Sequence, residues 1–477
     1  MKQEKYIVGI DGGSQSTKVV IYDLFGNVVS EGKQNLKSLH TPQAGIVEHP
    51  DDDLWYSLIK ACEQALADFP GEKNNIIGVG LCTIRFCRCL LNKKGELAAP
   101  VISWMDERVS KPYEHTNKET AYVTASSGYI THRLTGEFKD TSANYQGMWP
   151  IDTDTWNWSE DPSILEHVNI PREMLFELQP PGSILGYITD QASKMTGIPF
   201  DIPVVGTAND KAVEALGAGL LEEDRALISL GTYIAGMVPS ERNIKNPENF
   251  WTNFASVPGK YLLESNGIRR GMWTVSWFRE LFGDVLIKQA EAKQMSPEEF
   301  LNREAEQKVP PGSDGLITIL DWLAPADKPF RKGMMIGFDE RHRRAHIYHS
   351  ILEGIAMTMK NHLDSLFGER NMEVKEIIIS GGGSNGDIMM QLMADVFGVP
   401  AIRNEINGSA SLGAAINTAV ALKEYGTYSE AVENMVRVKD SFLPDKDKHV
   451  FYHKLNSEVY SQATNYTDGL LKKMYSL

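Results

Sequence analysis

The feature that most restricts the fold of this chain is a hairpin at its start. Residues 6–10 and 19–22 are apolar and β-prone, and the segment between them consists mainly of glycine, hydroxyl and charged residues. This pattern predicts two strands joined by a tip that holds a ligand rather than by a tight turn. Glycines let the backbone approach a bulky anion, and successive amide N–H groups with Ser and Thr hydroxyls can donate hydrogen bonds to phosphate oxygens.

Two charged residues of the hairpin favour the same interpretation. Lys18 supplies a positive point charge, and Asp11, at the end of the first strand, is placed to hold Mg²⁺ through water. An ordinary glycine-rich hairpin with a surface acid explains these residues as well. The choice between the two interpretations depends on the rest of the chain.

A similar pattern returns in the second half of the chain. Residues 226–230 and 234–238 are again predicted strands, with Gly231 and Thr232 at the turn. The repeated hairpin indicates a duplicated fold in which one loop from each half faces a shared cleft. The length of 477 residues also exceeds what one hydrophobic core usually serves. We therefore expect two domains, residues 1–222 and residues 223–477.

The order of the predicted elements indicates the fold class. Residues 27–31 predict a third strand, residues 51–69 have apolar side chains at helical spacing, and residues 76–82 form the continuous apolar run of an inner strand. Three antiparallel strands, a helix and another strand are the opening of a ribonuclease-H-like ATPase domain of the α/β class. A Rossmann fold would begin β-α-β with a GxGxxG turn, which is absent here.

A group of polar and aromatic residues predicts a sugar site. Residues 85–91 and 101–103 predict an inserted hairpin, and Trp104, Asp106 and Arg108 follow it directly. Carboxylates accept hydrogen bonds from hydroxyls, and an indole packs on the apolar face of a sugar. A solvated strand end with an Asp–Arg pair is the alternative.

Two strand-to-helix junctions carry further candidates. Asp210 opens a predicted helix where its carboxylate can face a cleft, although Asn or Asp at such a point is also a normal N-cap. Residues 376–380 predict an inner strand leading into Gly381, Gly382 and Gly383, whose backbone can pack flat against a planar ligand such as adenine. Alone, a triple glycine is a weak signal.

Composition excludes several classes of function. The formal net charge of -15, with no basic block to offset it, argues against nucleic acid as a partner. No apolar run is long enough to span a bilayer, and the start lacks the layout of a signal peptide. Cys82, Cys87 and Cys89 cluster without a nearby histidine, so we expect buried thiols rather than a zinc site. These features favour a cytoplasmic enzyme without a membrane partner.

Taken in order, the motifs resemble the FGGY family of carbohydrate kinases over nearly the whole chain. The matching segments are Asp11 to Lys18, Trp104 to Arg108, Tyr129 to Gly136, Gly206 to Asp210, Gly231-Thr232, Gly337 to Gly354 and Gly381 to Ser384. The resemblance implies two ribonuclease-H-like domains of the actin/Hsp70/sugar kinase superfamily with a cleft between them. ATP would lie mainly on the second domain and the sugar mainly on the first.

The resemblance also assigns roles to residues. Asp210 would be the catalytic base, and Asp11 would contact Mg²⁺ through water. The nucleotide contacts would be Ser14, Gln15, Ser16, Lys18, Gly231 and Thr232 at the phosphates, and Gly381, Gly382, Gly383, Ser384 and Asn385 at the adenine. The substrate contacts would be Arg85, Phe86, Trp104, Asp106 and Asp210.

Some positions depart from the family pattern. Glycerol kinases carry Arg-Glu and xylulose kinases carry Met-His where this chain has Arg85-Phe86, although Trp104, Asp106 and Arg108 favour the xylulose-kinase-like branch. The segment from residue 109 to 128 is shorter than in the family, which predicts a more open sugar site near Arg85 and His115.

The predicted function is ATP-dependent phosphorylation of a hydroxyl on a pentulose, a polyol or a related sugar, and a homodimer is compatible with this function. The alternative is a catalytically weak sugar-sensing regulator. Such regulators usually carry a DNA-binding helix pair before the first strand, whereas here that strand starts within a few residues of Met1. An Hsp70-like or actin-like ATPase is a third hypothesis, but the Trp104 cluster would have no purpose in it.

Overall fold

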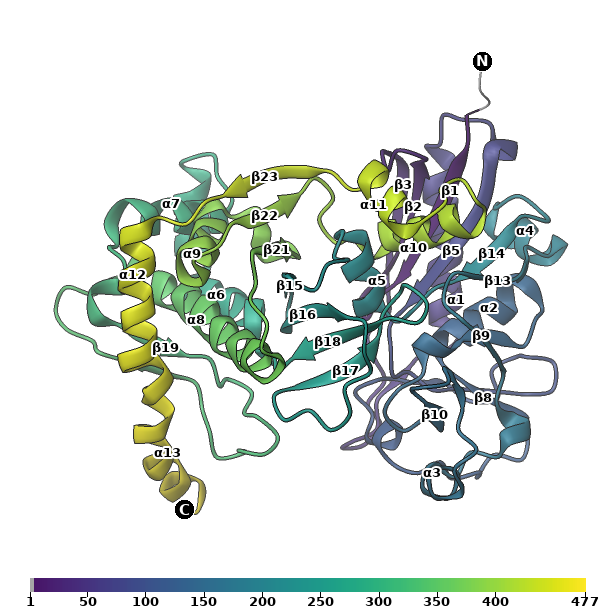
Figure 1. Cartoon of the computed structure of the whole chain (residues 1–477), viewed down its shortest axis with the longest axis horizontal. Helices are drawn as coiled ribbons and strands as arrows, with labels where there is room; N and C mark the ends of the chain where they lie inside the picture. Colours follow the sequence, from purple (N-terminus) through teal and green to yellow (C-terminus); the bar gives the residue numbers. More distant parts are fainter. Residues whose placement is uncertain (1–3) are drawn as a thin grey trace.

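The computed structural model describes residues 4–477. Its backbone forms two large β-sheets, one from each half of the chain, with helices against their faces (Figure 1). The first sheet has the strand order β13-β14-β5-β1-β2-β3. Its strands are β1 (Tyr6–Gly12), β2 (Ser16–Asp23), β3 (Val28–Asn35), β5 (Ile76–Thr83), β13 (Ser183–Tyr187) and β14 (Pro203–Gly206).

Strand direction brings three loops of the first half together. β1 and β2 are antiparallel with Asp11 opposite Lys18, whereas β1, β5 and β14 run parallel to one another. The carboxyl ends of parallel strands lie at the same edge of a sheet, which is where ligands bind in open α/β folds. Asp11, Arg85 and Asp210 all lie at or just after these three strand ends.

The second sheet repeats this arrangement in the order β17-β18-β16-β15-β21-β22-β23. β15 and β16 form an antiparallel hairpin, and β15, β21 and β22 are parallel, as β1, β5 and β14 are in the first sheet. The duplicated α/β fold predicted from the two hairpins is confirmed. The strands are β15 (Arg225–Leu230), β16 (Ile234–Ser240), β17 (Phe250–Phe254), β18 (Tyr261–Ser265), β21 (Glu376–Ser380), β22 (Ala401–Asn404) and β23 (Val438–Phe442).

Helices cover the sheets and complete the cores. In the first half α1 (Asp53–Ala67) packs on β2 and β3, and α2 (Ser126–Thr135) ends at Gly136 with a φ of 77°, as the glycine stop predicted. The large core of the second half is built mainly from its sheet and from helices that Figure 1 shows at the left. These helices are α6 (Gly271–Glu291), α7 (Pro297–Lys308), α8 (Arg344–Arg370), α9 (Asp387–Phe397), α12 (Lys446–Leu455) and α13 (Ser461–Tyr475).

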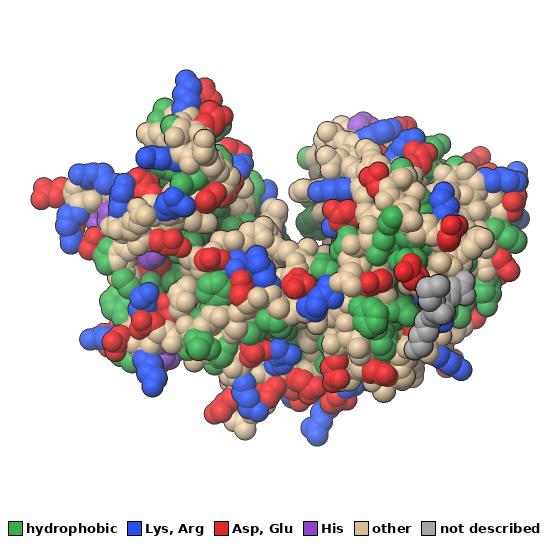
Figure 2. Space-filling view, turned by 90° about the horizontal axis from the view of Figure 1, so that it is seen from above, with side chains coloured by type: hydrophobic (Ala, Val, Ile, Leu, Met, Phe, Trp, Pro, Cys, Tyr) green, Lys and Arg blue, Asp and Glu red, His purple; other side chains and the backbone are tan. Residues whose placement is uncertain are grey.

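Two helices lie between the sheets. α5 (Asp210–Gly217) follows the first sheet but packs into a core with strands of the second, whereas α10 (Ala410–Ala421) lies between β22 and β23 of the second sheet in the sequence and packs on β1 and β5. α11 (Tyr428–Met435) lies beside α10, close to the first sheet in Figure 1. The last strand of the first sheet thus ends at residue 206, and the first strand of the second sheet begins at residue 225. After β22 the chain returns to the first sheet and forms α10 and α11 beside it (Figure 1). Figure 2 shows the two lobes with a hollow between them.

Glycines allow this close packing of α10. A Cβ at Gly413 would lie 2.0 Å from the carbonyl oxygen of Val213 on α5, and one at Gly217 would lie 1.9 Å from that of Ser409. A Cβ at Gly9 on β1 would lie 2.1 Å from the carbonyl oxygen of Ser411. Real Cβ atoms do not approach so closely, so glycine is required where the two halves meet.

The predicted inserted hairpin of residues 85–91 and 101–103 is different in the structure. β6 (Cys89–Leu91) pairs with β8 (Tyr122–Thr124), and β7 (Val101–Ile102) pairs with β4 (Glu48–His49), so only a single bridge joins Arg88 to Ile102. The local pairing remains as bridges of Arg88 with Ile102 and of Leu91 with Leu97, around the predicted turn, and the longer ladders of β6 and β7 form with strands that are distant in the sequence. The smaller elements not yet named are β9 (Lys139–Thr141), β10 (Ile151–Asp152), β11 (Asn157–Trp158), β12 (Glu177–Gln179), α3 (Pro162–Val168), α4 (Asp190–Thr196), β19 (Ile317–Ile319) and β20 (Met334–Ile336).

Two composition-based expectations can be compared with the structure. Cys82, Cys87 and Cys89 are buried and unpaired, and burial raises the pKa of each thiol. Over the described part of the chain, no helix is both long enough and apolar enough to cross a membrane.

Candidate active site

Asp210 lies at the point where β14 leads into α5. The N-cap of α5 is Asn209, whose side-chain oxygen accepts a hydrogen bond from the backbone N–H of Ala212 at 3.3 Å. The N-cap role that the sequence left open for Asp210 is therefore wrong, because the preceding residue already fills it. The Oδ1 atom of Asp210 is buried and has no hydrogen-bond partner among the described residues.

The surroundings of Asp210 suit a proton acceptor. Burial raises the pKa of its carboxyl above the ordinary value, against the opposing charges of Arg85 and Lys211. Its side chain keeps 29% of its surface exposed. A raised pKa, an unpaired oxygen and an open side are what a general base for a substrate hydroxyl requires.

Arg85 links the two halves of the chain beside Asp210. Its two terminal nitrogens donate hydrogen bonds to the carboxylate of Glu264 on β18, both at 2.8 Å, and its Nε lies 3.9 Å from Oδ1 of Asp210. The guanidinium lies 5.2 Å from the ring centre of Phe86 and 4.9 Å from that of Trp251. Because Glu264 neutralises it, Arg85 orients the site rather than offering a free cation.

The backbone at Phe86 is unusual. Its φ of 66° lies in the left-handed region, which bulky residues rarely adopt. Such strain is retained where the surrounding structure fixes it, and here it accompanies the placement of Phe86 against the guanidinium of Arg85. The departure from the family pattern at Arg85-Phe86 thus coincides with an aromatic and ionic cluster beside Asp210.

A second charged network lies under Asp210. The ammonium group of Lys211 donates to Glu214 at 2.9 Å and to the hydroxyl of Ser229 on β15 at 3.0 Å. The other oxygen of Glu214 accepts from Ser380 on β21 at 2.6 Å. Burial opposes ionisation of Glu214, but Lys211 and Ser380 together hold its pKa below the usual value. The network connects the start of α5 to the ends of β15 and β21, the two strands that precede Gly231 and Gly381.

Asp11 is close to this concentration of charge. Burial, together with the carboxylates of Asp210 and Glu214, raises the pKa of Asp11 to about 7, although Lys18 and Lys211 act in the opposite direction. A nearby cation would stabilise the ionised form of a carboxylate that lies close to two other carboxylates.

The surroundings of Asp11 fit the Mg²⁺ that the sequence predicted. Mg²⁺ normally keeps several waters and takes one or two carboxylates together with substrate phosphates. Within residues 4–477 no group of three or more His, Cys, Asp or Glu side chains is arranged to hold a metal by itself. Asp11 therefore fits an ion that arrives with a phosphate-bearing substrate rather than one held in a protein cage.

The tip of the first hairpin is open. Ser14 and Gln15 are exposed, and the turn is closed by a hydrogen bond from the backbone N–H of Gly13 to the carbonyl oxygen of Ser16 at 3.0 Å. Lys18 lies opposite Asp11 in the hairpin but pairs with Glu31 on β3 at 2.8 Å. A phosphate contact by Lys18 would compete with this partly exposed ion pair.

The second hairpin is held by the start of α6. The backbone N–H groups of Gly271 and Met272 donate to the carbonyl oxygens of Thr232 and Gly231, at 2.8 and 3.1 Å. The turn at Gly231 and Thr232 is therefore fixed in position while both residues remain accessible. The positive end of the α6 dipole lies at the same place, which favours an anion there.

The glycine loop after β21 lies next to this turn, because β15 and β21 are neighbouring parallel strands. Gly381 has a φ of 83°, and a Cβ there would lie 2.7 Å from the carbonyl oxygen of Leu230. A Cβ at Gly383 would lie 2.9 Å from the sulfur of Met272 on α6. Glycine is required at both positions for the loop to pack against the second hairpin and α6.

The other residues of this loop have different surroundings. Gly382 and Asn385 are exposed, and a Cβ at Gly382 would meet open space. Ser384 is buried and its hydroxyl donates to the carbonyl oxygen of Gly381 at 2.8 Å, so it shapes the loop. Among the five predicted adenine contacts, Gly382 and Asn385 are therefore the exposed ones.

The predicted sugar cluster at Trp104 is partly engaged within the protein. Both oxygens of Asp106 accept hydrogen bonds from Arg108, and one also accepts from the backbone N–H of Val47 at 2.6 Å. The Asp–Arg pair that the sequence left as the alternative is therefore present. Trp104 is 45% exposed and free to contact a ligand, whereas His115 bonds to Tyr113.

Several residues at the centre were missed from the sequence. Lys211, Glu214, Glu264 and Trp251 carry no motif, and their contacts join segments far apart in the chain. The one sequence signal among these residues is the charge of Lys211 directly after the predicted base.

Two loops suited to phosphates, an unpaired carboxylate and a cleft between duplicated domains define a phosphotransferase of the actin-like fold. The models of the FGGY family of carbohydrate kinases match this chain at residues 6–126 and 111–217 for the N-terminal domain and 226–422 for the C-terminal domain. The chain is 55% identical to the uncharacterized sugar kinase YgcE of Escherichia coli over 474 residues, which covers 99% of this chain and 96% of the relative.

Solved structures share the fold at low sequence identity. The gluconate kinase of Lactobacillus acidophilus superposes with a TM-score of 0.85 at 20% identity, covering 99% of this chain and 100% of that one. The xylulose kinase of Rhodospirillum rubrum gives a TM-score of 0.84 at 21% identity over 98% and 100%. The chain belongs to the FGGY family of carbohydrate kinases, and it is a sugar phosphotransferase.

Proposed function

We propose that the chain transfers the terminal phosphoryl group of ATP to a hydroxyl of a small carbohydrate, with Asp210 as the general base. The observation that carries this proposal is the Asp210 carboxylate, which has a raised pKa and keeps 29% of its side-chain surface exposed at the edge where three parallel strands end. Phosphoryl transfer needs in-line positioning, charge neutralisation and a proton acceptor, and little covalent chemistry from the protein.

The acceptor side is built around Asp210. The reacting hydroxyl donates its hydrogen bond to the exposed side of the Asp210 carboxylate, which takes the proton as the bond to phosphorus forms and the bond from phosphorus to the leaving ADP oxygen breaks. Arg85, which is hydrogen-bonded to Glu264 and lies against Phe86, forms one wall of the acceptor site. Trp104 offers an exposed indole to the sugar, and Asp106 orients Arg108 at the end of that strand.

The donor side uses the loops that the sequence predicted. The phosphates of ATP lie between the first hairpin, at Ser14, Gln15, Ser16 and Lys18, and the turn at Gly231 and Thr232. The adenine lies on the loop that exposes Gly382 and Asn385, with Gly381, Gly383 and Ser384 fixing the loop's shape.

Asp11 is the residue that would hold Mg²⁺, through water. When bound, the ion would supply positive charge against the phosphates of ATP. Lys211 adds a fixed positive charge beside Asp210 and keeps Glu214 ionised, so the base and the crowded acids stay in place in the ligand-free protein.

A screen for sugar-dependent ADP release tests the proposal. We expect turnover with one class of acceptor among pentuloses, hexuloses, polyols and sugar acids, and little hydrolysis of ATP without it. Saturable sugar binding without ADP release from any acceptor would instead support a sugar-sensing regulator. ATP hydrolysis that is indifferent to every sugar would contradict both. Fractionation of the native cell would test the proposed cytoplasmic location.

A further inference from the structure

Lys211 directly follows the proposed base Asp210 and reaches the second half of the chain. Its ammonium group donates hydrogen bonds to the carboxylate of Glu214 on α5 at 2.9 Å and to the hydroxyl of Ser229 on β15 at 3.0 Å. Ser229 lies two residues before Gly231, where the proposed phosphate turn begins. The ammonium group therefore lies between the proposed acceptor site and the turn proposed for the phosphates of ATP.

This ammonium group keeps a donor for a ligand. An ammonium group has three N–H donors, and two of them are used at Lys211. The side chain keeps 19% of its surface exposed, next to the partly exposed side chain of Asp210. Burial opposes the positive charge, but Glu214 and Asp210 raise the pKa of Lys211 above its ordinary value. The group therefore stays charged and accessible beside the proposed base.

The charge of Lys211 acts on three groups around the proposed point of transfer. Burial raises the pKa of the carboxyls of Asp11 and Asp210 and of the phenol of Tyr233, and the ammonium group acts in the opposite direction at each of them. Asp11 is the proposed magnesium ligand, and Tyr233 directly follows the phosphate turn. Because such effects are appreciable only between nearby charges, the ammonium group lies close to all three.

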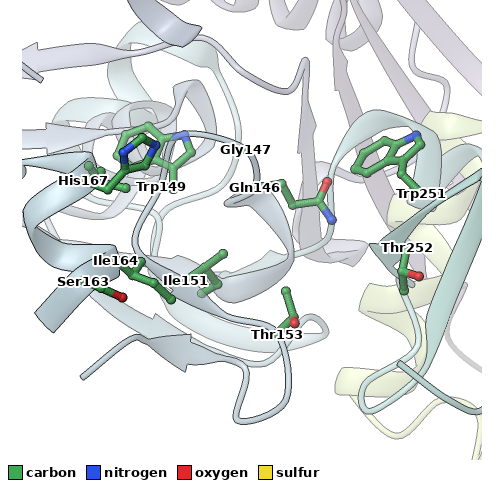
Figure 3. A pocket seen from close by; sticks show the side chains of 11 residues that line it. Gln146, Gly147, Trp149, Ile151, Thr153, Ser163, Ile164, His167, Trp251 and Thr252 are labelled. Atoms are coloured by element: carbon green, nitrogen blue, oxygen red, sulfur yellow. The ribbon is translucent and has the colours of Figure 1, made fainter. Parts of the chain in front are cut away.

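Two other cations near the proposed base are held by acids. Both terminal nitrogens of Arg85 donate to Glu264, and Lys18 pairs with Glu31 at 2.8 Å. Trp251, which lies against the guanidinium of Arg85, also lines a cavity of about 510 Å³ between the two halves of the chain (Figure 3). None of the residues that line this cavity is Lys or Arg. Among these cations, Lys211 is the best placed for a group that moves from the phosphate turn to the acceptor.

We infer that Lys211 is a further catalytic residue, whose third N–H donates a hydrogen bond to an oxygen of the phosphoryl group during its transfer. The inference rests on the proposed function. In the transfer, the acceptor oxygen forms a bond to the terminal phosphorus and Asp210 takes the hydroxyl proton. The bond from that phosphorus to the leaving oxygen breaks, and its electron pair stays on ADP.

Lys211 keeps its own protons throughout this step. A fixed donor of this kind acts most strongly on charge that develops in the transition state, so its contribution falls on kcat rather than on KM. The alternative role is purely structural, in which Lys211 only connects α5 to Ser229 on β15.

Four variants separate these two roles. Lys211→Met removes the ammonium group, and a double variant with Glu214→Gln also removes the carboxylate that would be left without its partner. Ser229→Ala removes the connection to β15 and keeps the ammonium group. Lys375→Met makes the same change at a lysine whose side chain is 77% exposed. All four are first compared with the native protein by thermal unfolding.

Two kinds of measurement follow. The release of ADP gives kcat and the KM for the acceptor. Calorimetry in the presence of Mg²⁺ gives the Kd for ADP with and without aluminium fluoride, which mimics the phosphoryl group in transfer when it binds beside ADP.

We expect Lys211→Met and the double variant to lower kcat by about 10²–10³-fold, while the KM for the acceptor and the Kd for ADP change by no more than a few-fold. The extra affinity that aluminium fluoride gives to ADP should fall by a comparable factor. Ser229→Ala should retain most of the native kcat, and Lys375→Met should match the native protein.

A kcat of Lys211→Met within a few-fold of the native value would overturn the inference, as would an equal loss in Ser229→Ala or a loss confined to KM. If Lys211→Met does not fold, the double variant gives the answer, since replacing both members of a buried ion pair is often tolerated. If the native protein phosphorylates no acceptor, the proposed function fails. In either case, an unchanged affinity of Lys211→Met for ADP with aluminium fluoride would show that Lys211 does not contact the phosphoryl group.

Discussion

Replacing Asp11 by Asn should stabilise the ligand-free protein at neutral pH while weakening the binding of Mg²⁺ that we propose for this residue. The carboxyl group has its pKa raised from 3.8 to about 7, mainly by burial and then by Asp210 and Glu214. Between these two values the folded state holds a proton that the unfolded state has released. Stability therefore falls as the pH rises through this window, and an uncharged amide escapes the penalty.

The size of the effect follows from the shift. A difference of about 3 units at roughly 1.4 kcal/mol per unit sets a ceiling of about 4 kcal/mol. Water at the open side of the cleft screens part of the repulsion, so we expect a gain of ~1–3 kcal/mol at about pH 8. The gain should fall toward zero as the pH approaches about 4, where both states are protonated.

Urea unfolding of ligand-free protein across this pH range measures the effect. Glu72→Gln, which removes an exposed carboxylate, is the control and should show no such trend. Adding Mg²⁺ and ADP should reverse the order of stability, because only the native protein keeps the carboxylate. Equal stability of Asp11→Asn and the native protein at every pH would refute the claim that burial and nearby carboxylates destabilise the ionised form of Asp11.

Three further predictions concern two contacts between the halves of the chain and one contact between two copies of the chain. Glu264→Gln removes the carboxylate that accepts both hydrogen bonds from Arg85. We expect the free energy of unfolding to fall by about 3–5 kcal/mol and the KM for the acceptor to rise. Unchanged values of both would show that the pair is dispensable. Gly413→Ala would place a Cβ 2.0 Å from the carbonyl oxygen of Val213. Calorimetry should therefore show a free energy of unfolding that is lower by about 1–3 kcal/mol. A variant as stable as the native protein would contradict the close packing of α5 and α10. If the protein is a homodimer through the exposed apolar face of α13, Leu470→Asp should shift its mass in light scattering from dimer to monomer, and an unshifted dimer would place the interface elsewhere.

Local patterns explain why much of the fold could be predicted. The two hairpins, the helix ending at Gly136 and the inner strand before Gly381 are all encoded within short windows by apolar periodicity and glycine. The repetition of the hairpin then indicated the duplication, and the order of the motifs indicated the family.

What the sequence could not provide depends on long-range partners. Asp and Asn are both good N-caps, and only the folded structure shows that the side chain of Asn209 accepts the hydrogen bond from the backbone N–H of Ala212. Likewise, the salt bridge between Arg85 and Glu264 joins residues from opposite halves, and no local pattern announces it.

Non-local pairing also explains the other differences. The strand at Cys89–Leu91 forms its ladder with the distant Tyr122–Thr124, whereas its pairing with the nearer segment is limited to bridges at Arg88–Ile102 and Leu91–Leu97. The return of α10 to the first sheet has the same origin, since its small residues fit against glycines of β1 and β5.

The most direct test of the account is the turnover of Asp210→Asn with the best acceptor. Asn is nearly the same size as Asp, and Asn209 remains the N-cap, so the fold and the affinity for ADP should be retained. A positioned base contributes roughly 10²–10⁴-fold to rate, so kcat should fall by about that factor. Folded Asp210→Asn that phosphorylates the sugar within a few-fold of the native rate would contradict the assignment of Asp210 as the base.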